Sequence, residues 1–119
     1  MTFFEITAIL LFMSLFKKKT YRSERFLEFT RRQSCLIRKT PSPDPHHLFT
    51  GGMGIKCCDL YSIPLDRLVH DELHTIGRGS FENRHGIDLT RELLIHMARY
   101  ICLLEGNDPD EYDWGVKKQ

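Results

Sequence analysis

The sequence predicts an α+β fold in which two short strands precede the main helices. Two short apolar stretches, residues 46–49 and 60–65, flank a glycine-rich loop and lie beside prolines, a pattern typical of a pair of strands. From Asp66 onwards, and again over residues 89–104, apolar side chains recur at helical spacing. The expected order is strand, loop, strand, helix, with a further helix on either side.

We divide the 119 residues into one domain and two flanking segments. Residues 1–19 form a hydrophobic and basic extension, residues 20–104 the domain, and residues 105–119 an acidic, flexible tail. The apolar part of the extension is shorter than the about 20 residues that span a bilayer, so no stable membrane association is expected. Because Met13 begins a second plausible start, residues 1–12 are interpreted as an upstream extension without a role, in preference to an interfacial anchor or a helix that covers a partner.

The first part of the domain is predicted from capping and proline signals. Ser23 should cap a helix that runs to about residue 33. The prolines of residues 40–45 exclude a helix there and predict a turn into the first strand. The glycines of the following loop, Gly51, Gly52 and Gly54, allow a ligand to approach the backbone closely.

The second part of the domain is predicted to be helical. Asp66 should cap the helix that carries His70 and His74, and Gly77 and Gly79 should end it. A short helix is expected next, over residues 80–84, followed by a histidine, His85, that is interpreted as structural.

The last helix should begin after Asp88 and pack on the core through an apolar stripe. His96 lies off this stripe and is expected at the surface. Trp114, in the acidic tail, was considered as a residue that docks on a partner. The stripe consists of Leu89, Leu93, Met97, Ile101 and Leu104.

The cysteines do not predict a disulfide framework. Two of them are adjacent and cannot easily bridge one another, and no cleavable secretion signal is visible. The expected location is therefore cytoplasmic. The adjacent pair could add a metal ligand, although a buried or loop thiol is the commoner situation. The four cysteines are Cys35, Cys57, Cys58 and Cys102.

Four histidines occur within a span of 29 residues, at 46, 47, 70 and 74. His70 and His74 are four apart on a predicted helix and therefore share a face, as the two histidines of helical zinc motifs do. Neighbouring residues on a strand point to opposite faces, so only one of His46 and His47 can readily join them. The other is then available for proton transfer. The alternative for an isolated pair of this kind is a solvated helix face.

Positive charge is concentrated before the histidines. Residues 17–39 hold nine basic side chains against two acidic ones, although the whole chain has a formal charge of only +1. Such a region is where a phosphate backbone would bind, and Arg31, Arg32 and Lys56 are the candidate contacts. A solvated helix face is the alternative for the arginines, and a solvated lysine for Lys56.

The motifs around the histidines are similar to those of a known family. The run PDPHHLFTGGMGIKCCDLYSIPL, the following HDELH, Phe81, Glu82 and His85-Gly86 resemble phage-encoded HNH-type proteins related to the recombination-enhancement nucleases that work with RecA filaments. The resemblance covers about residues 20–104. It implies a small ββα-metal (HNH, or His-Me finger) core flanked by N- and C-terminal helices.

The resemblance also implies roles for individual residues. It makes His46, His70 and His74 ligands of one divalent metal ion (Mg, Mn or Zn) and His47 the general base, with the roles of His46 and His47 open to exchange. Asp59 stands near the middle residue of the HNH motif, which orients the base or supports the metal ligands. The alternative for Asp59 is an ordinary cap of a turn or strand end.

Relatives of this type usually hold a second, structural zinc ion, and this chain departs from them there. Cys35 matches the first ligand, but Arg38, Asp66 and Val69 stand at the other three positions. Because a structural zinc site needs all four ligands, we expect this zinc to be lost.

The expected function is that of a metal-dependent DNA endonuclease, derived from a phage or prophage and linked to recombination. Its expected partners are DNA and a recombinase filament. The alternative is a catalytically inactive module that binds nucleic acid or protein on the same scaffold. A metalloprotease is disfavoured, because Asp71 stands where such enzymes carry a glutamate after the first helical histidine.

Overall fold

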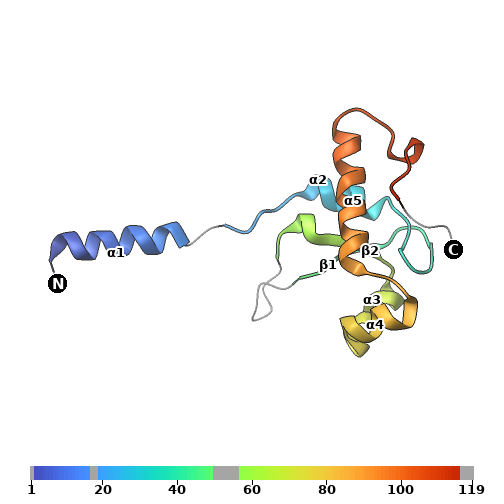
Figure 1. Cartoon of the computed structure of the whole chain (residues 1–119), viewed down its shortest axis with the longest axis horizontal. Helices are drawn as coiled ribbons and strands as arrows, with labels where there is room; N and C mark the ends of the chain where they lie inside the picture. Colours follow the sequence, from blue (N-terminus) through green and yellow to red (C-terminus); the bar gives the residue numbers. More distant parts are fainter. Residues whose placement is uncertain (1, 17–18, 50–56, 116–119) are drawn as a thin grey trace.

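The computed structural model describes residues 2–16, 19–49 and 57–115, and within them five α-helices accompany one two-stranded antiparallel sheet (Figure 1). The predicted α+β class is confirmed, and so is the order of two strands followed by a helix. The elements are α1 (Phe3–Phe16), α2 (Glu24–Arg31), β1 (Asp44–His47), β2 (Ser62–Leu65), α3 (Arg67–Ile76), α4 (Arg78–His85) and α5 (Leu89–Leu104), with 3-10 turns η1 (Asp59–Tyr61) and η2 (Pro109–Glu111).

Three predicted helix caps are confirmed. The Ser23 hydroxyl accepts a hydrogen bond from the backbone N–H of Phe26, at the start of α2. The Asp66 carboxylate accepts one from Val69 at the start of α3, and Asp88 does the same for the first turn of α5. Each cap pairs a backbone donor that has no partner within its helix.

Several bounds differ from the prediction. β1 covers Asp44–His47 instead of residues 46–49, because its extent follows its pairing with β2. β2 begins only at Ser62, since the preceding residues form η1. α4 begins at Arg78, so the prediction that Gly79 ends the preceding helix is wrong. Gly77, with a φ of 82°, ends α3 by itself.

The register of the sheet is set by two prolines. Pro45 of β1 stands directly opposite Pro64 of β2. Neither residue has a backbone N–H, so this pair must occupy a position of the ladder at which no hydrogen bonds are exchanged. The bond from the Leu48 N–H to the Tyr61 carbonyl, 2.9 Å long, fits the same alternation.

The main core lies on one face of the sheet. Side chains opposite one another in the ladder point to the same face, so His46 shares a face with Ile63, and Asp44 with Leu65. Ile63 and Leu65 are fully buried against α3, α4 and α5. The buried residues of this core are Cys35, Ile63, Leu65, Val69, Leu73, Phe81, Leu89 and Leu93.

A second, aromatic core joins α2 to α5. Phe26, Phe29 and Tyr100 pack together, and the imidazole of His96 lies over both phenylalanine rings, with ring centroids 5.1 Å apart in each case. His96 is only 5% exposed, so its predicted surface position is wrong. Its Nε2 atom lies 2.8 Å from the Thr30 hydroxyl, which satisfies the buried ring.

The apolar stripe of α5 is buried along only part of its length. Leu89 and Leu93 are buried as predicted, and Met97 packs on both cores. Ile101 and Leu104 are 53% and 46% exposed, so the prediction that they face the core is wrong. The reason is that α2, on which this half of α5 packs, has only eight residues.

The acidic segment after α5 has more structure than predicted. Pro109–Glu111 form η2, and Asp110 makes an ion pair of 2.6 Å with Arg99 of α5. The indole N–H of Trp114 donates a hydrogen bond of 2.8 Å to the Pro109 carbonyl. The described part of this segment is therefore bound to α5, and Trp114 contacts its own chain.

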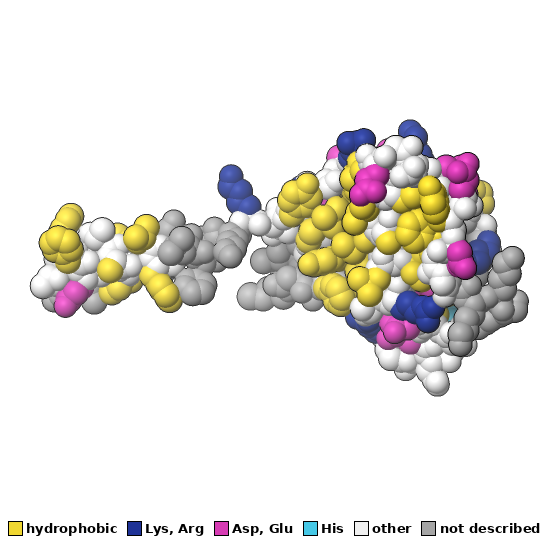
Figure 2. Space-filling model, turned by 45° about the horizontal axis from the view of Figure 1, so that its top comes forward, with side chains coloured by type: hydrophobic (Ala, Val, Ile, Leu, Met, Phe, Trp, Pro, Cys, Tyr) yellow, Lys and Arg dark blue, Asp and Glu magenta, His cyan; other side chains and the backbone are white. Residues whose placement is uncertain are grey.

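α1 lies apart from the other described elements in Figure 1 and in Figure 2. The chain before α2 runs outward without regular structure from Ser23 to Lys19. Neither α1 nor any other helix in the described ranges combines the length and the apolar character that crossing a membrane requires.

Candidate metal centre

Three histidines from two elements converge beside the sheet. His46 projects from β1, while His70 and His74 lie one turn apart on α3. The ring centroid of His46 is 4.4 Å from that of His70 and 5.3 Å from that of His74. One ring nitrogen of each residue lies within 4.8 Å of the other two. No other group of three or more histidine, cysteine or acidic residues comes together in this way among the described residues.

These nitrogens fit a divalent metal ion. Zinc binds histidine nitrogens at about 2.0–2.1 Å, which brings tetrahedral ligands to roughly 3.4 Å from one another. The Nε2 atoms of His70 and His74 are 2.9 Å apart, close to that spacing. A set of three protein ligands is also typical of catalytic sites, which keep one position for water or substrate.

The surroundings favour the neutral forms of His46 and His70. Burial, together with the charges of the neighbouring histidines, lowers the pKa of His46 to about 4. Burial and His74 also lower the pKa of His70. Neutral imidazoles have the free lone pairs that a metal ion needs, so the site is ready for a cation near neutral pH.

His47 points to the opposite face of the sheet from His46 and contacts an acid. Its Nε2 atom lies 2.8 Å from Oδ1 of Asp59. Because an ionised carboxylate can only accept hydrogen bonds, Nε2 carries the proton and Nδ1 carries the lone pair. The contact with Asp59 thus selects the tautomer of His47.

Asp59 is itself firmly held. It is only 4% exposed, and its carboxylate accepts hydrogen bonds from the Ser23 backbone N–H (2.8 Å) and the Arg22 guanidinium (3.2 Å). Burial raises the pKa of Asp59, but the bonds from His47, Ser23 and Arg22 outweigh it and lower the pKa below its usual value. The carboxylate of Asp59 contacts both the imidazole of His47 and the backbone of Ser23, the residue that caps α2. The role of Asp59 beside a general base stays a prediction.

A cleft of about 400 Å³ opens beside these histidines, between α2 and α3. His47 and His70 both line it, and so do two arginines, one from each helix. A phosphate group in this cleft would lie near positive charge and near both histidines. The lining residues are Leu27, Arg31, Asp44, Pro45, His47, Arg67, His70 and Asp71.

The predicted nucleic-acid contacts differ in position. Arg31 lines the cleft, where Glu24 and Glu28 hold its guanidinium at 2.8 and 3.3 Å. Arg32 does not line it and points into solvent, with 77% of its side chain exposed. Lys56, like the glycines of the predicted loop, lies outside the described residues.

Arg67 was missed in the sequence. It is the first residue of α3, pairs with Asp44 at 3.5 Å and lines the cleft. The signal was present, because Arg67 precedes His70 by three residues and so shares its helix face.

The positions compared with a structural zinc site have other partners. Cys35 and Val69 are buried in the main core. Asp66 caps α3 and pairs with Arg38 at 3.2 Å, while the Thr40 hydroxyl donates to it at 2.8 Å. This network links the turn before β1 to the start of α3 and so helps to position His70.

Comparison with known proteins gives a family. The family model described as "Protein of unknown function (DUF968)" matches residues 7–100. The chain belongs to this family. The matched region contains the three histidines of the cluster, His46, His70 and His74, and also the hydrogen-bonded pair His47 and Asp59.

The chain is also similar to the "Uncharacterized protein YdfU" of Escherichia coli (strain K12), to which it is 40% identical over 81 residues. The aligned part covers 66% of this chain but only 23% of YdfU, so the chain spans about a quarter of that protein. No solved structure matches the chain significantly.

Proposed function

We propose that this DUF968 chain is a metal-dependent DNA endonuclease of the HNH type. The observation that carries the proposal is the joint geometry of two groups: three histidine nitrogens within 4.8 Å of one another, and a separate histidine held at 2.8 Å by a buried carboxylate. The first group suits a cation and the second suits proton transfer, and residues of both line one cleft.

The chain order supports the same interpretation. His46 comes from the first strand of an antiparallel pair, and His70 and His74 come from the helix that follows the second strand. Strand, strand and helix around a metal is the ββα-metal arrangement that the sequence motifs imply.

In the proposed reaction, His46, His70 and His74 hold one divalent ion. When bound, the ion supplies positive charge that offsets the charge developing on the scissile phosphate. His47 accepts a proton from the attacking water at Nδ1, and Asp59 stabilises the resulting imidazolium through Nε2. Arg31 and Arg67 bind phosphate oxygens and so position the backbone in the cleft.

Cleavage assays test this proposal. Purified protein is incubated with supercoiled plasmid and with single-stranded DNA, in EDTA and in magnesium, manganese or zinc. We expect metal-dependent cutting that is lost in His47→Ala and retained in His85→Gln. His85 is a suitable control because it contacts Glu72, at 2.9 Å, and lies outside the cluster.

The result also tests the alternative. A folded, metal-loaded protein that cuts neither DNA, with or without a recombinase filament, would contradict the nuclease proposal and favour a binding module on this scaffold. Cutting that appears only with the filament would extend the proposal to a recombinase as partner.

A further inference from the structure

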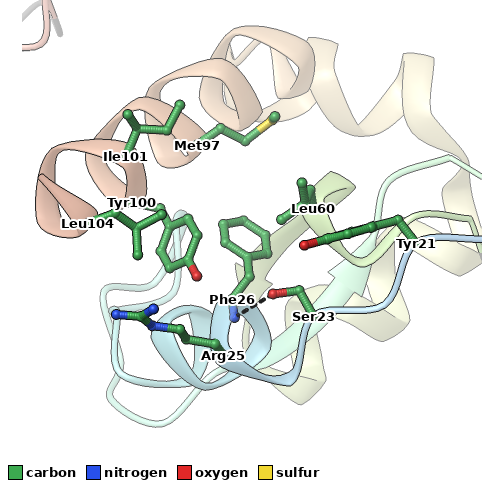
Figure 3. A pocket seen from close by; sticks show the side chains of 9 residues that line it. All are labelled: Tyr21, Ser23, Arg25, Phe26, Leu60, Met97, Tyr100, Ile101 and Leu104. Atoms are coloured by element: carbon green, nitrogen blue, oxygen red, sulfur yellow. Dashed lines mark hydrogen bonds between the residues drawn. The ribbon is translucent and has the colours of Figure 1, made fainter.

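An apolar groove lies between α2, η1 and the second half of α5, away from the histidine cluster (Figure 3). Its volume is about 460 Å³. In Figure 3 side chains from the three elements point toward one another around the opening. Its apolar lining is Phe26, Leu60, Met97, Tyr100, Ile101 and Leu104.

The groove explains the exposed end of the α5 stripe. Ile101 and Leu104 are at helical spacing for burial, yet 53% and 46% of their surfaces remain exposed. Figure 2 shows hydrophobic side chains gathered over much of this view of the folded body, and again along α1. Among the described residues, apolar side chains are thus exposed on the body and on α1.

α1 has the apolar composition of a buried helix, although its described side chains are exposed in this structure. Its exposed side chains include Phe3 (82%), Phe4 (84%) and Leu10 (62%). Its polar groups pair within the helix: Thr2 and Glu5 exchange hydrogen bonds as a capping box, and the Thr7 hydroxyl donates to the Phe3 carbonyl. The hydroxyls of Thr2 and Thr7 thus have partners inside this segment, and the one charged side chain among the described residues of α1, Glu5, lies in its first turn.

A second copy of the chain could supply the apolar surroundings that α1 lacks in a single copy. A helix that is apolar on all sides is normally surrounded, either by protein or by a bilayer. α1 has 14 residues and is too short to span a bilayer. One groove would cover only one side of it, whereas two copies bring two grooves and two such helices together.

We propose that the groove binds α1 of a second copy, so that two copies exchange their N-terminal helices in a symmetric dimer. Tyr21, on the arm that leads to α1, lines the groove of its own body, so each arm leaves beside the groove that receives its partner's helix. The two exchanged helices cover each other's remaining faces. A specific interface needs on the order of 1,000 Å² of buried surface, and the exchange of both helices adds two helix-in-groove contacts to one interface.

Light scattering coupled to size exclusion tests the exchange over a range of concentrations. The full chain should have twice its mass of 14.0 kDa. Leu10→Glu on α1 and Ile101→Glu in the groove should each shift the equilibrium to monomer by at least tenfold in dissociation constant. Leu94 is the control on α5: it is 62% exposed, against 53% for Ile101, but lies outside the groove, so Leu94→Glu should remain a dimer. Circular dichroism establishes that each variant is folded.

Mixing the two variants distinguishes binding of α1 to the groove of a second copy from binding of α1 to the groove of its own chain. In a mixed pair, α1 of the Ile101→Glu chain meets an intact groove on the Leu10→Glu chain, so part of the dimer should return. A chain that is monomeric at all concentrations, or a dimer that both variants leave unchanged, would overturn the proposal. None of His46, His47, His70 and His74 lines the groove, so the outcome is independent of the proposed nuclease activity.

Discussion

The imidazole of His47 and the carboxylate of Asp59 are joined by a hydrogen bond of 2.8 Å, and residues 22 and 23 bind the same carboxylate from the other side. Asp59 therefore connects the start of α2 to β1. Because Asn has nearly the same size and shape as Asp, the contribution of the Asp59 charge to the proposed catalysis can be measured with little change in shape.

Asp59→Asn should lower the rate of DNA cleavage by about 100-fold or more, within the range that general-base catalysis contributes. The amide keeps the size of the side chain but loses the charge that stabilises protonated His47. Single-turnover rates measure the effect, and metal content should not change. If instead the variant loses metal and cleavage together, Asp59 supports the fold and not the base.

Metal binding should stabilise the protein through the three clustered histidines. At a free ion concentration of 100 times the dissociation constant, the free energy of unfolding should rise by about 2.7 kcal/mol. Urea titrations with zinc and with EDTA measure this difference. His74→Gln should remove most of the gain, whereas His85→Gln should keep it; equal gains in both variants would place the ion elsewhere.

The two arginines of the cleft should contribute to DNA affinity through phosphate contacts. Arg31→Ala and Arg67→Ala should each reduce the slope of log affinity against log salt by about one. Arg32→Ala is the matched control, because Arg32 follows Arg31 directly but does not line the cleft. Fluorescence anisotropy at several salt concentrations gives the slopes. Equal effects of all three variants would indicate a diffuse basic surface.

His96 should make the fold less stable in acid. Burial lowers its pKa to about 4, whereas an exposed histidine in the unfolded chain has a pKa near 6.5. The unfolded state therefore binds more protons between these values. The free energy of unfolding should be unaffected above pH 6.5 and fall between pH 6.5 and 4, by on the order of 3 kcal/mol in total.

Comparison with His96→Phe isolates this contribution. The Thr30 hydroxyl donates to the Phe26 carbonyl, so it must accept from the Nε2–H of His96, and a second proton on the ring finds no place in the aromatic core. Phenylalanine suits this position, where the ring of His96 stacks on Phe29 and is tilted against Phe26. Urea denaturation in EDTA at pH 7.5 and 4.5 should show a smaller difference for the variant, and an unchanged difference would assign the acid sensitivity to His46 and His70.

The sequence predicted the parts of the fold that depend on local chemistry. The caps Ser23, Asp66 and Asp88 were predictable because each one satisfies the backbone of the next few residues. Helical spacing likewise put His70 and His74 on one face. Strand alternation indicated that one of His46 and His47 would join them, but the choice of His46 depended on the pairing of β1 with β2, and only the resemblance indicated that choice in advance.

The errors came from contacts made far along the chain. His96 was expected at the surface because helical spacing alone does not reveal that α2 covers that face of α5. Ile101 and Leu104 were expected in the core because nothing local marks where a partner helix ends. Arg67 differs from these cases, because its spacing of three residues from His70 is local and is enough to place both side chains on one face of α3.

The two opposed prolines, Pro45 and Pro64, also favour the register in which His46, and not His47, faces α3. A slip of one residue between β1 and β2 would turn His46 away from α3 and bring His47 toward it. Pro45 and Pro64 stand opposite each other at a position without ladder hydrogen bonds, and a slip of one residue would put one of them where a backbone donor is required. Two residues without a reactive side chain thereby keep the imidazole that faces His70 and His74 apart from the one that is bound to Asp59.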